Sequence, residues 1–303
     1  MYNLERILCP TDFSTASIEA IRYASFLANH TGSKLTLIYV EEYDTAPIGF
    51  FERDEQFIAD YRRRVTALAE EKFAEIIVQE SLNPNRTFTL IQFGTAYHEI
   101  IEVAEANRFS VVVIATEGLG LSSPHLIGRT VERVVRLCRT PVITLRPRQE
   151  VKEWNIKTIL CPTDFSEYSN FAIPYAVSLA RSFQARIILL HVTDLAVQHP
   201  EALLEKFPDP SFYHDQADKI QFEKIVGRDV EPENTIVRLA DEYQVDLIVI
   251  GTHGARGMRR VQIGNTVEEV VRRTAIPVLT ITHPIHKAVF PRRFMGDYGE
   301  SGV

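Results

Sequence analysis

The chain has 303 residues, a formal net charge of −7 and a hydrophobic content of 45%. This length suffices for two ordinary domains, and the acidic balance argues against a general nucleic-acid-binding protein. No apolar run approaches the ~20 residues that a membrane span requires. The N-terminal stretch lacks the pattern of a secretory signal, and the three cysteines show no metal-ligand spacing. We therefore expect a cytoplasmic protein with no membrane partner and no nucleic-acid partner.

Strands and helices are expected to alternate along the first half of the chain. The apolar patterns predict strands at about 5–9, 34–40, 86–92, 110–115 and 141–145. A helix is expected to begin after Ser14 as its N-cap, and further helices are expected at about 54–81, 96–107 and 129–138. Apolar strands that alternate with helices are typical of a parallel sheet with both faces covered.

The second half of the chain repeats this pattern. The stretch ILCPTDFS occurs at 7–14 and returns unchanged at 159–166, and IGRTVERVV at 127–135 is matched by IGNTVEEVV at 263–271. The second copy is shorter in its middle, where HPEALLEKFPDPSFYHDQ carries three prolines and predicts at best a broken helix. KIQFEKIV at 219–226 is expected to be its third strand. A repeat of this length indicates a duplicated domain rather than a solenoid.

The predicted fold class is α/β, with two tandem doubly wound, Rossmann-like domains that each contain a five-stranded parallel sheet. Domain 1 is expected over residues 1–150 and domain 2 over residues 151–285. A C-terminal tail is expected over 286–303, outside the repeat.

Two repeated motifs lie where strands are expected to end. PTDFS follows the first strand of each copy, and GTHGARGMRRVQIGNT at 251–266 follows the fourth strand of copy two. In a doubly wound sheet such ends form the ligand site, and a glycine loop that enters a helix is suited to anions. Arg256, Arg259 and Arg260 add positive charge there. The plainer interpretation is turn chemistry, with Asp164 capping its own turn and Asn265 capping a helix.

These motifs resemble those of the universal stress proteins. Gly251-x2-Gly254-x9-Gly264 followed by a small polar residue is similar to the ATP-binding signature of that family, and the resemblance covers both copies. The resemblance implies ATP or another adenine nucleotide as the ligand and leaves Mg²⁺ open as a companion of the phosphates. The nucleotide-binding residues that it implies are Pro162, Thr163, Asp164, Val192, Gly251, His253, Gly254, Gly264, Asn265 and Thr266.

The resemblance also implies roles for these residues. Asp164 would hold the ribose and adenine side, Val192 would contact adenine, and the glycines with Asn265 would take the phosphates. Asn265 stands where the family usually has Ser or Thr. For His253, support of the loop is the plainer alternative to a phosphate contact.

Copy one departs further from the signature. Ala115 replaces the first glycine, Glu117 adds a carboxylate to the loop, and Arg129 follows Gly128. We therefore expect nucleotide binding mainly in domain 2 and a degenerate site in domain 1. The counterpart residues of that degenerate site are Asp12, Val40, Gly118, Gly128 and Thr130.

No catalytic residues and no metal site are predicted from the sequence. The P-loop spacing is absent, and no Ser/His/Asp or Cys/His arrangement is evident, so a regulatory module is favoured over an enzyme and slow ATP hydrolysis stays open. A receiver-like phosphoacceptor is rejected, because PTDF supplies only one acid and TLRPR has no Lys. A nucleotide-independent interaction scaffold remains the alternative. The resemblance further implies that the two copies pair through their last strands as a pseudo-dimer, and it leaves homodimerisation open.

Overall fold

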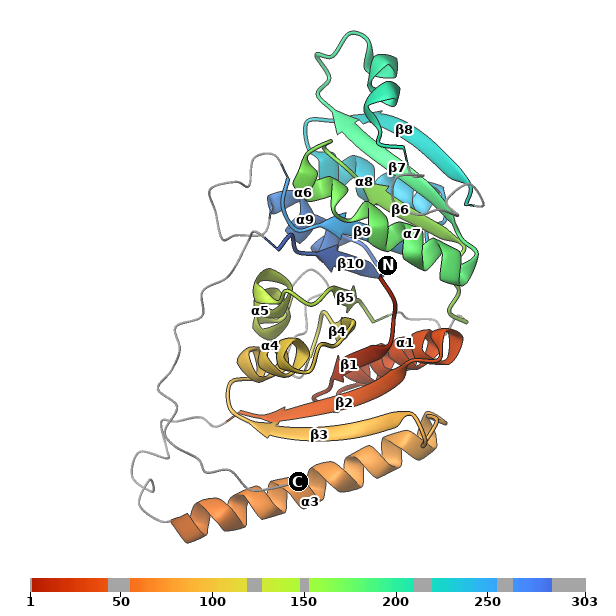
Figure 1. Cartoon of the computed structure of the whole chain (residues 1–303). Coiled ribbons are helices and arrows are strands. Elements are labelled where there is room, and N and C mark those ends of the chain that lie inside the picture. The colour runs from red at the N-terminus through yellow and green to blue at the C-terminus, as the bar shows by residue number, and fades with distance from the viewer. Residues whose placement is uncertain are drawn as a thin grey trace.

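A computed structural model of the chain describes residues 2–42, 55–118, 127–147, 153–209, 220–254 and 264–284. Its strands and helices alternate in two consecutive domains (Figure 1). The elements of domain 1 are β1 (Arg6–Pro10), α1 (Thr15–Thr31), β2 (Lys34–Glu41), α3 (Glu55–Gln79), β3 (Thr87–Phe93), α4 (Ala96–Ala106), β4 (Val111–Ala115), α5 (Arg129–Leu137) and β5 (Val142–Leu145). Most of these bounds lie within one or two residues of those predicted. The predicted tail, 286–303, lies outside the described residues.

Domain 2 repeats this order with a different middle. Its elements are β6 (Thr158–Pro162), α6 (Glu167–Asn170), α7 (Ile173–Phe183), β7 (Arg186–Thr193), the 3-10 helix η1 (Pro200–Lys206), β8 (Phe222–Arg228), α8 (Pro232–Glu242), β9 (Leu247–Gly251), α9 (Asn265–Arg273) and β10 (Val278–Ile281). The short η1 lies where the proline-rich stretch predicted a broken helix. Strand β8 begins and ends slightly later than the predicted 219–226.

All ten of these strands form one sheet, in the order β3-β2-β1-β4-β5-β10-β9-β6-β7-β8. Within each domain the strands are parallel, and the two halves join where β5 and β10 pair antiparallel, with Ile143 opposite Leu279. The five-stranded sheets predicted for the two domains are thus halves of a ten-stranded sheet. The predicted pseudo-dimer through the last strands is confirmed, and this pairing covers an edge in each domain.

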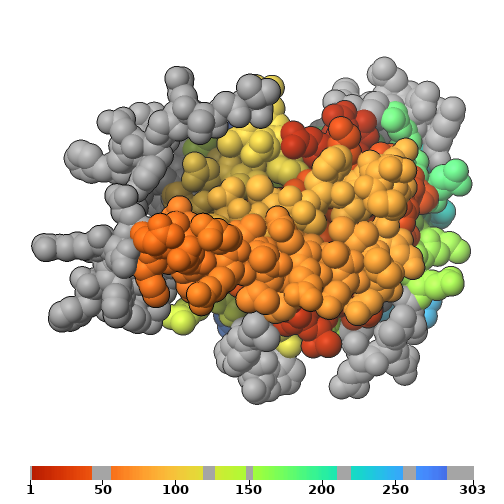
Figure 2. All heavy atoms as spheres, turned by 90° about the horizontal axis from the view of Figure 1, so that it is seen from below, coloured from red at the N-terminus to blue at the C-terminus, as the bar shows by residue number. Residues whose placement is uncertain are grey.

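The strands alternate their side chains between two apolar layers. One layer is continuous through both domains, and in it α1, α3 and α7 cover strand residues such as Ile7 and Ile187. The opposite layer consists of two clusters, one under α4 and α5 and one under α8 and α9, and Ile127 packs against both. In the view from below, α3 runs across the outer face of domain 1 (Figure 2).

Aromatic contacts further fix the domains to each other. The Tyr23 ring of α1 packs edge-on against Trp154 with centroids 4.7 Å apart. The His30 ring stacks on Phe183 of α7 at 4.1 Å, and its Nε2 lies 2.9 Å from the Ser182 carbonyl oxygen. None of the helices in the described part of the chain has both the length and the apolar character needed to cross a membrane.

Candidate functional site

The predicted site of domain 2 lies at the carboxyl ends of β6 and β9. These strands are neighbours, and the strand order reverses between them, so the loop after each one leaves the sheet at the switch point. Thr163 and Asp164 follow β6, while Thr252, His253 and Gly254 follow β9. The fold therefore brings together two motifs that are almost ninety residues apart in the chain.

The Asp164 carboxylate is held by its own turn. Its Oδ1 accepts hydrogen bonds from the Ser166 amide (3.0 Å), the Ser166 hydroxyl (2.6 Å) and the Ser169 hydroxyl (2.6 Å). The intervening Phe165 takes a left-handed backbone conformation with φ of 65°, which is uncommon for a bulky residue. The plainer interpretation of Asp164, that it caps its own turn, is thus correct for one carboxylate oxygen.

The second oxygen, Oδ2, faces the glycine loop. A Cβ atom placed on Gly254 would lie only 2.4 Å from Asp164 Oδ2, so any other residue at position 254 would require this carboxylate to move. Because residue 164 is exposed, the oxygen lies at the mouth of the site rather than in the core. The arrangement places a carboxylate beside a glycine backbone, and the ligand roles that the resemblance implies for these two residues stay predictions.

Gly251 lies close to the backbone of α6. A Cβ atom there would lie 2.9 Å from the Tyr168 carbonyl oxygen and 3.1 Å from Ser169 Cα, both in the backbone of α6. This glycine is therefore required by helix packing. The phosphate role that the resemblance implies for Gly251 stays a prediction.

The glycine loop closes onto its own start. The Gly264 amide donates to the Thr252 carbonyl oxygen (3.0 Å), and Gly264 is the N-cap of α9. Asn265 is therefore the first helical residue instead of the cap, and its side chain is exposed, while Thr266 is half-buried. Arg256, Arg259 and Arg260 lie outside the described residues.

His253 is buried, and its Nδ1 lies 2.9 Å from the Thr252 hydroxyl, which also donates to the Thr282 hydroxyl at 3.3 Å. This contact fits the loop-supporting alternative for His253. Val192 is half-buried near the end of β7, where it packs against the apolar layer under α8.

His191 is a site residue that the sequence analysis missed. It lies on β7 directly before Val192, its Nδ1 is 2.8 Å from the Thr163 carbonyl oxygen, and its ring stacks on Phe165 at 4.1 Å. The Phe207 ring meets Phe165 edge-on at 5.1 Å. The strained turn around Phe165 is thus supported by two aromatic neighbours. The signal available in the sequence was the histidine that directly precedes Val192 near the end of the second strand.

Domain 1 keeps the same backbone frame. Asp12 Oδ1 accepts from the Ser14 amide (3.0 Å) and from the Ser14 hydroxyl, and a Cβ atom on Gly118 would lie 2.8 Å from Asp12 Oδ2. The Gly128 amide donates to the Thr116 carbonyl oxygen at 2.9 Å, as in domain 2. Val40 and Thr130 are half-buried at the positions of Val192 and Thr266. The two copies therefore share this geometry, and the degenerate character of the domain 1 site stays a prediction.

The charges of domain 1 differ from those of domain 2. Glu117 replaces His253, and its charge acts on Arg146, which stands where domain 2 has Thr282. Burial lowers the pKa of the Arg146 guanidinium, and the Glu117 carboxylate partly opposes this shift. Arg146 is thus a cation whose pKa is affected by the charge of Glu117.

The other reactive side chains in the described part of the chain are the cysteines and a histidine–glutamate group on α4. The three cysteines are buried, and burial raises the pKa of the Cys138 and Cys161 thiols to about 12. On α4, ligand atoms of His98, Glu99 and Glu102 lie within 4.8 Å of one another, a grouping that the sequence analysis passed over. These side chains are partly or fully exposed, and a histidine next to a glutamate one helical turn away is common on helix surfaces.

Comparisons with known proteins agree with this architecture. The universal stress protein family model matches the chain twice, over residues 3–146 and 155–282. The fold and the site define a doubly wound module of the kind that binds ligands at its strand ends, and the chain belongs to the universal stress protein family.

Individual relatives support the tandem arrangement. Universal stress protein Slr1230 of Synechocystis is 24% identical over 302 residues, covering 91% of this chain and 99% of its own. Universal stress protein MJ0531 of Methanocaldococcus jannaschii is 31% identical over 144 residues, which is 42% of this chain and 83% of its own. The crystal structure of a universal stress protein from Archaeoglobus fulgidus shares the fold with a TM-score of 0.69 and 20% identity, covering 91% of this chain and 98% of that one.

Proposed function

We propose that this chain is a regulatory module of the stress response that binds ATP or another adenine nucleotide in domain 2. The approach of Gly254 to Asp164 Oδ2 carries the proposal, because it joins the ribose-binding carboxylate and the phosphate-binding loop implied by the family signature. In this arrangement Asp164 accepts from ribose hydroxyls through Oδ2, since Oδ1 already accepts three hydrogen bonds. Mg²⁺ can accompany the phosphates.

The other nucleotide contacts follow from the elements around the switch point. The apolar side chain of Val192 faces adenine near the end of β7, next to the His191–Phe165 stack. Asn265 and Thr266 stand at the start of α9, where exposed backbone N–H groups and the helix dipole favour phosphate. No general base or nucleophile is assigned here, so a switch that binds nucleotide is favoured over an efficient ATPase.

Domain 1 is proposed to bind nucleotide poorly. A phosphate above its glycine loop would meet the Glu117 carboxylate, and two like charges ~4 Å apart repel by about 4 kcal/mol at an effective dielectric constant near 20. Its retained frame has a structural use as the partner half of the ten-stranded sheet. The expected stoichiometry is one nucleotide for each chain.

The test is calorimetric titration of ATP into protein stripped of co-purified nucleotide. Gly254→Glu places a carboxylate against Asp164 and is expected to abolish binding, whereas the matched Gly118→Glu change in domain 1 should leave the single site intact. Two sites in the wild type would show that domain 1 is competent. Absence of binding would refute the proposal and favour the interaction scaffold, while phosphate release at saturation would reveal slow hydrolysis.

A further inference from the structure

A cavity of about 170 Å³ lies between α5 of domain 1 and α9 of domain 2. Its walls are apolar, with Val135 of α5 and Val267 and Val271 of α9, and its polar lining includes Arg136 and Asn265. One water occupies roughly 30 Å³ in the liquid, so the cavity has room for a group the size of a phosphate. Residues of both domains are needed to form it.

The antiparallel join of β5 and β10 explains why these two polar residues meet. Helices α5 and α9 directly precede those strands, so they lie on the same face of the sheet and run in opposite directions. The last turn of α5, with Arg136, is therefore opposite the first turn of α9, with Asn265. Asn265 is also the residue that follows the last glycine of the domain 2 motif, so it belongs to both the cavity and the proposed phosphate end.

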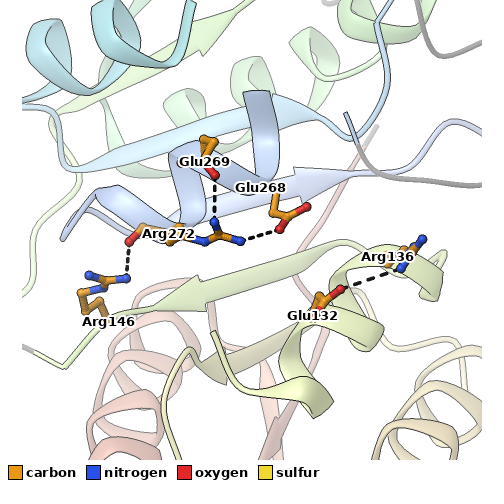
Figure 3. A network of polar contacts seen from close by, with 6 residues as sticks. All are labelled: Glu132, Arg136, Arg146, Glu268, Glu269 and Arg272. Atoms are coloured by element: carbon orange, nitrogen blue, oxygen red, sulfur yellow. Dashed lines mark hydrogen bonds and ion pairs between the residues drawn. The ribbon is translucent and has the colours of Figure 1, made fainter. Parts of the chain in front are cut away.

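The pseudo-symmetric arginine of α9 is held much more tightly than Arg136. Arg272 binds Glu268 at 2.6 Å and Glu269 at 2.9 Å (Figure 3). Of these residues, only Glu268 is among those that line the cavity. Among the residues that the structure describes, the ion-pair partner of Arg136 is Glu132, at 3.8 Å (Figure 3). The difference arises because domain 1 has Arg133 where domain 2 has Glu269, and Arg133 lies over the Tyr97 ring at 4.6 Å.

We infer that this cavity is a terminal-phosphate subsite of domain 2, and that Arg136 of domain 1 contacts the last phosphate of a bound nucleoside triphosphate. The inference rests on the proposed function and adds a specificity to it. A guanidinium binds phosphate through charge-assisted hydrogen bonds, and the Asn265 amide can donate alongside it. Domain 1 thereby completes the site of domain 2, although its own glycine loop is altered.

Two carboxylates in the cavity set the conditions for this contact. Glu268 is paired with Arg272, so its charge is already compensated. Glu132 holds Arg136 only at 3.8 Å, and a phosphate has to compete with it for the guanidinium. The site therefore favours a ligand whose terminal phosphate carries two charges and reaches the cavity. A ligand whose phosphates do not reach the cavity gains nothing from Arg136.

The experiment compares ATP and AMP by calorimetry at one fixed ionic strength. Arg136→Gln is expected to weaken ATP binding about tenfold and to leave AMP binding unchanged, because only the longer nucleotide reaches the cavity. Arg238→Gln is the matched control, since it removes an equal charge from an exposed i,i+4 ion pair on α8, and it should change neither affinity. Glu132→Gln frees Arg136 and is expected to tighten ATP binding.

Three results overturn the inference. These are equal losses for ATP and AMP in Arg136→Gln, unchanged ATP binding in that variant, and weaker ATP binding in Glu132→Gln. Circular dichroism spectra and melting curves identify any variant that fails to fold, and the Glu132→Gln result then decides independently. Wild-type protein that binds neither nucleotide would instead refute the proposed function, so the two failures are distinguishable.

Discussion

Replacing Gly251 by Ala is expected to destabilise domain 2, although alanine is the residue that domain 1 carries at the same position. The new Cβ would lie 2.9 Å from the Tyr168 carbonyl oxygen and 3.1 Å from Ser169 Cα. These are backbone atoms of α6, so rotation of a side chain cannot relieve the contact. Either α6 or the end of β9 has to shift, and overpacking of this kind typically costs about 1–3 kcal/mol.

An opposing effect reduces this magnitude. A Gly→Ala change without strain stabilises a protein by about 0.4–1 kcal/mol, because the unfolded chain loses conformational freedom. The expected net loss is therefore about 1–2 kcal/mol. In domain 1, where Ala115 stands at this position, α1 is continuous from Thr15, whereas domain 2 has the separate short α6.

Urea unfolding followed by circular dichroism measures the change, and hydrogen exchange of the β9 amides locates it. Ala115→Gly serves as the reciprocal variant and should also destabilise, by about 0.5–1 kcal/mol, because it removes a buried methyl group and adds backbone freedom. A Gly251→Ala protein that is more stable than the wild type would refute the reasoning, since it would show that α6 does not restrict this position.

Three further changes test the site and the domain junction. Gly254→Ala displaces the exposed Asp164 carboxylate and should weaken nucleotide binding roughly tenfold with little change in stability. The matched Gly118→Ala change in domain 1 should leave the affinity unaltered, and equal affinities in both variants would contradict the role assigned to Asp164. The thiols of Cys138 and Cys161 should not react with a disulfide reagent at pH 8 until the protein unfolds, because burial raises the pKa of each thiol to about 12. Fast reaction of the native protein would contradict this, since it would show that solvent reaches these thiols in the folded state. His30→Ala removes the stack on Phe183 and a hydrogen bond to Ser182, so a loss of about 1–2 kcal/mol is expected in urea unfolding, and an unchanged midpoint would mean that the junction is held elsewhere.

The repeated sequence determines most of the fold because its signals are local. Ser14 is the N-cap of α1 as predicted, and the alternation of strands and helices leaves few topologies open. The bounds of the third strand of domain 2 differ from those predicted, because its pairing with β7 continues to Arg228, opposite Thr193, beyond the apolar alternation. The pairing of β5 with β10 was implied by the resemblance alone, since a short apolar strand does not identify its neighbour.

The site was predictable in its members but less so in their contacts. Sequence motifs identify Asp164 and Gly254, yet the 2.4 Å approach between them depends on how two distant turns fold against each other. The contact of Gly251 with α6 was likewise not predictable from the sequence, because domain 1 has the continuous helix α1 where domain 2 has α6 and α7 as separate helices. The cavity beside Arg136 depends on the antiparallel strand pairing, so only the three-dimensional structure reveals it.

The altered loop of domain 1 differs from that of domain 2 by a pair of changes that introduce opposite charges. In domain 2 the Thr252 hydroxyl contacts His253 and Thr282, and domain 1 replaces both partners at once, with Glu117 and Arg146. These two changes supply charges of opposite sign, and the Glu117 carboxylate acts electrostatically on the Arg146 guanidinium. As a result, the buried hydroxyl of Thr116 has no hydrogen-bond partner among the described residues. A buried polar group without a partner typically lowers the stability of the folded state by about 1–3 kcal/mol.

Arg146 also reaches across the domain junction, because its guanidinium donates to the Arg272 carbonyl oxygen at the end of α9 (Figure 3). The charge that Glu117 brings to domain 1 is therefore compensated by a residue that also binds the last helix of domain 2. Domain 1 thus keeps the backbone geometry of domain 2, differs from it in two polar partners, and hydrogen-bonds to domain 2 through one of them. The shared ten-stranded sheet and this contact make the two domains one structural unit, in which domain 1 contributes Arg136 to the proposed phosphate subsite of domain 2.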